Sequence, residues 1–82
     1  MSESEIRQVA ELIADARPVF AGRPAAIQGG ALADLTAMWL AGHVMSGDRA
    51  GTIKLRQEIL ANHITMIRKL IEINERMMGT LT

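Results

Sequence analysis

Asp34 and His63 are the residues whose types and positions could do chemistry together. Each is a titratable side chain within a helical pattern of mostly apolar residues, where burial is expected. If the chain folds back on itself near residue 49, position 63 comes opposite position 35, so the two side chains could hydrogen-bond across the helices. Such a pair would fix helix register, and the alternative roles are proton carrier and metal ligand. We expect a buried polar pair with the structural role.

A metal site is not expected. His43 should lie about twelve residues from the level of His63, which is roughly 18 Å along a helix axis. The chain has no cysteine, and Asp34, His63 and their copies in a dimer are too few for a zinc site. The sequence therefore predicts no metal and no cofactor.

Nucleophilic catalysis has no support in the sequence either. Ser2 and Ser4 lie near the N-terminus and Ser46 lies in a turn, and no G-x-S-x-G motif surrounds any of them. The glycines at 29–30 and 47–51 match neither G-x-x-x-x-G-K-[ST] nor G-x-G-x-x-G. We therefore predict no catalytic residues and no enzymatic activity.

Three helices must position these side chains, and the sequence predicts them over about residues 3–16, 25–45 and 52–78. With 82 residues, of which 49% are hydrophobic and 2% aromatic, the chain has room for a single helical domain with an aliphatic core. Ser2 and Glu5 have the spacing of a capping box at the start of the first helix.

Proline and glycine set further expectations for the first two helices. Pro18 should end the first helix near Ala16, because the residue before a proline disfavours the helical conformation. Gly29 and Gly30 cost roughly 1 kcal/mol each relative to alanine within the second helix. They should have a packing reason, because small residues continue every fourth position from Gly29 as a ridge that another helix could approach: Ala33, Ala37 and Ala41.

The length and the apolar pattern of the third helix indicate that two copies of the chain associate. Its apolar residues recur at helical spacing, and no Pro or Gly lies between residues 52 and 78. Such a helix is a rod about 40 Å long, whereas a compact globule of 82 residues is only about 30 Å across. A second copy of the chain should therefore cover the apolar stripe. The expected interface residues are Leu60, Ile64, Ile67, Ile71, Asn74 and Met78.

The predicted protein is all-α, with a short N-terminal helix packed on a long antiparallel helical hairpin that dimerises into a helical bundle. Its formal net charge is zero, so no long-range field attracts nucleic acid or anionic lipid. The polar, acidic N-terminus is unlike a secretory signal and favours a cytoplasmic protein. We predict a homodimeric interaction, regulatory or scaffold module that pairs through its C-terminal helix and also binds a protein partner. Its core anchors are Trp39, Leu60, Ile64, Ile67 and Ile71.

One alternative is a dimeric nucleic-acid-binding regulator. Arg68, Lys69 and Arg76 share one side of the third helix. Glu72 and Glu75 interrupt this basic group, and no aromatic residue accompanies it for base stacking. A solvated helix surface explains the pattern better.

The other alternative is a small membrane-active helical hairpin. Residues 25–45 have about the length of a membrane-spanning helix. Asp34 lies near the centre of that segment, where an acidic residue costs roughly 2.5–3.5 kcal/mol on insertion scales. The sequence therefore favours a helix covered by protein.

Overall fold

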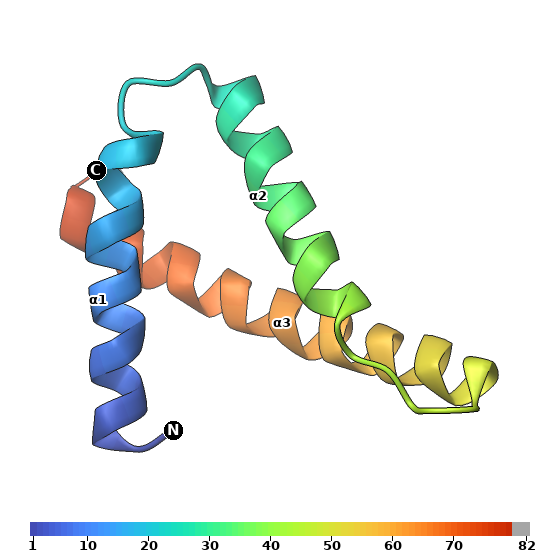
Figure 1. The fold of residues 1–82 in the computed structure, drawn as a ribbon. Coiled ribbons are helices and arrows are strands. Elements are labelled where there is room, and N and C mark those ends of the chain that lie inside the picture. The colour runs from blue at the N-terminus through green and yellow to red at the C-terminus, as the bar shows by residue number, and fades with distance from the viewer. Residues whose placement is uncertain (80–82) are drawn as a thin grey trace. The chain divides into compact units, whose positions relative to one another are not determined.

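The protein is built from α-helices alone over residues 1–79, which a computed structural model describes (Figure 1). No strand occurs among these residues, so the all-α prediction is confirmed. The helices are α1 (Glu3–Phe20), α2 (Ala25–Ala41) and α3 (Arg49–Met78).

The chain divides into two compact units. The first is Met1–Asp34, and the second begins at Leu35. The division falls inside α2, so the first half of this helix belongs to the same unit as α1 and its last turns to the same unit as α3.

A capping box starts α1, as the spacing of Ser2 and Glu5 predicts. The Ser2 hydroxyl accepts a hydrogen bond from the Glu5 backbone N–H, and the Ser2 N–H donates to the Glu5 carboxylate, both at 3.1 Å. The backbone N–H of Ser2, followed by its hydroxyl, lowers the pKa of Glu5 below its ordinary value. This cap therefore stabilises α1 above the ordinary pKa and is lost as the pH falls through the lowered one.

The helix α1 continues through Pro18 and ends at Phe20, so the expected end near Ala16 is wrong. A proline costs a helix one N–H donor, but contacts beyond it hold the last turn. The Ala21 N–H donates to the Arg17 carbonyl at 2.9 Å. The Phe20 carbonyl accepts from Gln28 Nε2 at 2.7 Å.

The boundaries between α2 and α3 also differ from those expected. The helix α2 ends at Ala41 instead of Met45, because the His43 N–H bonds to the Leu40 carbonyl in a tight closing turn at 3.0 Å. The helix α3 begins at Arg49 instead of Thr52, because Asp48 is its N-cap.

Thr52 anchors the connection between α2 and α3. It is 6% exposed and is the buried residue of the described part of the chain. Its hydroxyl accepts a hydrogen bond from the Met45 N–H at 2.9 Å and lies 2.8 Å from the Asp48 carbonyl, to which it can donate. Asp48 in turn accepts from the Gly51 N–H at 2.8 Å. The connection is thus held by one hydroxyl and one carboxylate.

Gly51→Ala should destabilise the protein by about 1 kcal/mol, because the added Cβ would collide with the Asp48 carboxylate and break the cap. Gly30→Ala is the control, since a Cβ at that position meets nothing within 4 Å. That change should instead stabilise the protein by up to about 1 kcal/mol through helix propensity. Urea unfolding followed by circular dichroism measures both changes, and equal effects would contradict this role of Gly51.

Candidate functional site

The end of α2 is closed by two side chains. The final carbonyls of a helix lack partners within it, and here His43 and Arg56 supply them. His43 Nδ1 lies 2.8 Å from the Trp39 carbonyl. Arg56 of α3 donates from Nη2 to the Ala41 carbonyl at 2.9 Å and from Nε to the His43 carbonyl at 3.1 Å. We call residues 39–56, which include these groups, the α2–α3 joint.

The charge of Arg56 suits this position. A helix carries a partial negative charge at its C-terminus, so a guanidinium there is stabilising. Arg56 also reaches its two carbonyls with separate N–H groups of one planar fork, which fixes its direction. The first turns of α3 are therefore tied to the last turn of α2, and Figure 1 shows the end of α2 against α3.

Two histidines contact the indole of Trp39. The ring centroid of His43 lies 5.3 Å from that of Trp39, edge to face at 85°. The ring centroid of His63 lies 4.8 Å from it at 48°. The two imidazoles are therefore much closer than the roughly 18 Å expected along a straight helix pair. Because a carbonyl only accepts hydrogen bonds, the proton of a neutral His43 lies on Nδ1, which leaves the Nε2 lone pair free of that contact.

The two residues of the predicted polar pair differ in exposure and belong to different units. His63 is half-buried against Trp39 in the second unit. Asp34 is exposed and ends the first unit. A hydrogen bond between Asp34 and His63 stays a prediction.

Arg56 is the residue of this site whose capping role sequence reasoning missed. It lies seven residues before His63, so both occupy one position of the heptad pattern on the apolar stripe of α3. A guanidinium within an apolar stripe was the available signal. Its partners are thirteen and fifteen positions earlier in the sequence, and no local pattern identifies them.

The predicted interface residues lie along one face of α3 and remain largely accessible. Ile67 is 42% exposed and Met78 is 68% exposed. Leu60, at 38%, lines a hollow with Ala37, Leu40 and Ala41 of α2, so the preceding helix partly covers it. No hydrophobic side chain is buried in the described part of the chain. An apolar face of this extent normally marks a binding surface.

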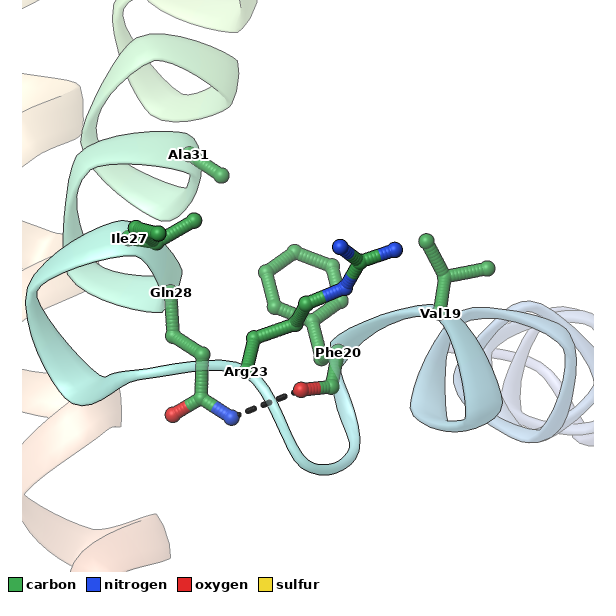
Figure 2. Close-up of a pocket in the computed structure, with 6 residues that line it drawn as sticks. All are labelled: Val19, Phe20, Arg23, Ile27, Gln28 and Ala31. Carbon is green, nitrogen blue, oxygen red and sulfur yellow. Dashed lines mark hydrogen bonds between the residues drawn. The ribbon is translucent and has the colours of Figure 1, made fainter.

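A second hollow lies within the first unit, at the turn between α1 and α2 (Figure 2). It has a volume of about 180 Å³, below the range of roughly 300–1,000 Å³ that is usual for small-molecule sites. Figure 2 shows Gln28 reaching the Phe20 carbonyl beside it. The lining residues are Val19, Phe20, Arg23, Ile27, Gln28 and Ala31.

Residues 1–79 contain neither a metal cluster nor a membrane span. No group of three or more acidic or histidine side chains in this part is arranged to hold a metal ion. None of its helices combines the length and the apolar character that crossing a membrane requires. The features that remain are therefore the joint and the exposed face of α3.

Arg56→Met should destabilise the protein by about 1–2 kcal/mol, because it keeps the length of the side chain but leaves two carbonyls at the end of α2 without donors. Arg68→Met makes the same change on the polar side of α3 and should stay within about 0.5 kcal/mol of the parent protein. Urea unfolding gives both values. A comparable loss in the two variants would contradict the capping role of Arg56.

The contact between Trp39 and His63 should contribute a coupling energy of about 0.5–1.5 kcal/mol in a double-mutant cycle with Trp39→Phe and His63→Ala. The cycle uses the free energies of unfolding of the parent, the two single variants and the double variant. Additive single effects would show that the two rings do not stabilise each other.

Comparison with models of protein families, with curated proteins and with solved structures finds no match to this chain. We therefore infer its function from the contacts and the exposed faces of the described residues.

Proposed function

We propose that this protein is a self-associating helical interaction module with a regulatory or scaffolding role. In the proposal, α2 and α3 form an antiparallel hairpin, and two copies pair through the apolar face of α3. The observation that carries the proposal is the exposed apolar face of a 30-residue helix.

Energetics support a partner for this face. Folding an ordered chain costs roughly 1–2 kcal/mol of backbone entropy per residue, and burial of apolar surface provides most of the compensation. No hydrophobic side chain in residues 1–79 is buried, although almost half of the chain is hydrophobic. A surface supplied from outside would provide the missing burial.

The distribution of charge supports a second copy as that partner. On α3, the charged residues after Arg56 lie on the side away from Ile67 except Glu75, which is half-buried at the edge of the apolar face. The centre of the face therefore presents no charge that an oppositely charged partner would have to match. A formal net charge of zero also leaves two copies without mutual repulsion.

Ile67→Asp should break this assembly. Burying an isoleucine contributes about 1.5–3 kcal/mol, and a two-fold dimer would lose it on both sides. The dissociation constant should therefore rise on the order of a hundredfold. Native mass spectrometry and light scattering across a concentration series measure it.

Thr65→Asp is the matched control for Ile67→Asp. It introduces the same charge two residues earlier on the polar side of α3, where Thr65 is exposed and bonds only to its own helix, at the Ala61 carbonyl. This variant should remain as dimeric as the parent. A parent protein that is monomeric at every concentration, or an Ile67→Asp variant with unchanged affinity, would overturn the proposal.

A further inference from the structure

Within its own unit, α2 contacts part of the first half of α3, where Arg56 caps α2 and His63 contacts Trp39. Ile53, which also lies in the first half, is 44% exposed. From Ile64 onward the apolar side chains have no such cover, and Ile71 is 51% exposed. We call residues 64–78 the free segment. It is about 22 Å long at the usual helical rise.

We propose that the second copy lies antiparallel on this segment, so that the free segment of one subunit covers the free segment of the other. The inference rests on the proposed function, since it specifies the partner and its direction. In this arrangement each joint lies beyond the end of the partner's α3. The joints of the two subunits therefore lie at opposite ends of the paired α3 helices.

A parallel pair would bring the two joints together. Packed helices lie 8–10 Å apart, and a helix with its side chains is about 10–12 Å across. In a parallel pair, Trp39 of each subunit would lie against His63, one residue from the start of the free segment, and the end of each α2 would lie at Arg56. Because Arg56 and His63 share the heptad position of Leu70 and Met77, both α2 ends would meet the parallel seam and push the two α3 helices apart. An antiparallel pair avoids this obstruction.

The spacing of the central residues along the free segment also suits an antiparallel second copy. Its central positions are Ile67, Leu70, Asn74 and Met77, separated by three, four and three residues. This order reads the same in both directions about position 72. Reversal sets Ile67 against the partner's Met77 and Leu70 against the partner's Asn74. One surface thus fits a second copy of itself, as a two-fold interface requires.

Asn74 is the polar residue of this face, and its geometry agrees with an apolar neighbour. Its Nδ2 donates to the Leu70 carbonyl of its own helix at 2.8 Å. The amide therefore has a partner without a second amide across the interface. In a parallel pair of the same seam, Asn74 would face its own copy, which is the arrangement in which a seam asparagine usually specifies register.

Engineered cysteines test the direction, because the chain contains no natural cysteine. Leu70→Cys and nitrogen-15-labelled Asn74→Cys proteins are mixed in a glutathione redox buffer, and native mass spectrometry counts the labelled, unlabelled and mixed disulfide dimers. Disulfides form only where the Cα atoms are about 4.4–6.8 Å apart. The antiparallel register predicts mixed disulfides at least tenfold above either homodimer. Thr65→Cys, on the polar side, should form none.

The outcomes separate this inference from the proposed function. Dimers in which homodisulfides dominate, or in which no disulfide forms, overturn the antiparallel register and leave self-association through α3 intact. A protein that is monomeric before any crosslinking overturns both.

Discussion

The guanidinium of Arg56 at the end of α2 is the interaction on which the second unit depends. By donating to the Ala41 and His43 carbonyls, it fixes where the last turn of α2 meets α3. That position brings Trp39 onto His63 and covers part of the first half of α3, where Leu55 and Ile59 are half-buried and Ile53 stays 44% exposed. The second half keeps its apolar side chains exposed. One charged side chain on an apolar stripe thus positions the end of α2 on α3 within the second unit.

The helices themselves could be predicted from the sequence, because the spacing of apolar residues reports helical structure locally. The capping box at Ser2 was equally readable, since both of its partners lie within one turn. The ends of α1 and α2 were not. Besides local turns, Gln28 and Arg56 hold these ends by bonding to carbonyls many positions earlier in the chain. A sequence pattern contains no record of such contacts.

The glycines also show that a sequence pattern does not reveal tertiary contacts. Gly29 and Gly30 suggested close packing, but a Cβ at either position would meet open space among the described residues. The sequence analysis assigned Gly51 no packing role, yet it is the position at which a Cβ would collide with the Asp48 cap. Its requirement comes from a hydrogen bond that exists only after the turn has formed. The candidate site was thus partly predictable: the face of α3 followed from periodicity, whereas the joint followed from tertiary contacts.

The exposure of the apolar side chains has a consequence for the lifetime of the protein in a cell. A chain whose hydrophobic surface is covered only by binding gains stability in proportion to the logarithm of its partner's concentration. If that partner is a second copy, newly made chains at low abundance spend more time unfolded and are open to proteolysis. Doubling synthesis would then raise the folded amount more than twofold. Because the isoleucines of α3 are accessible in a single chain, the folded protein would then accumulate only above a threshold level of expression.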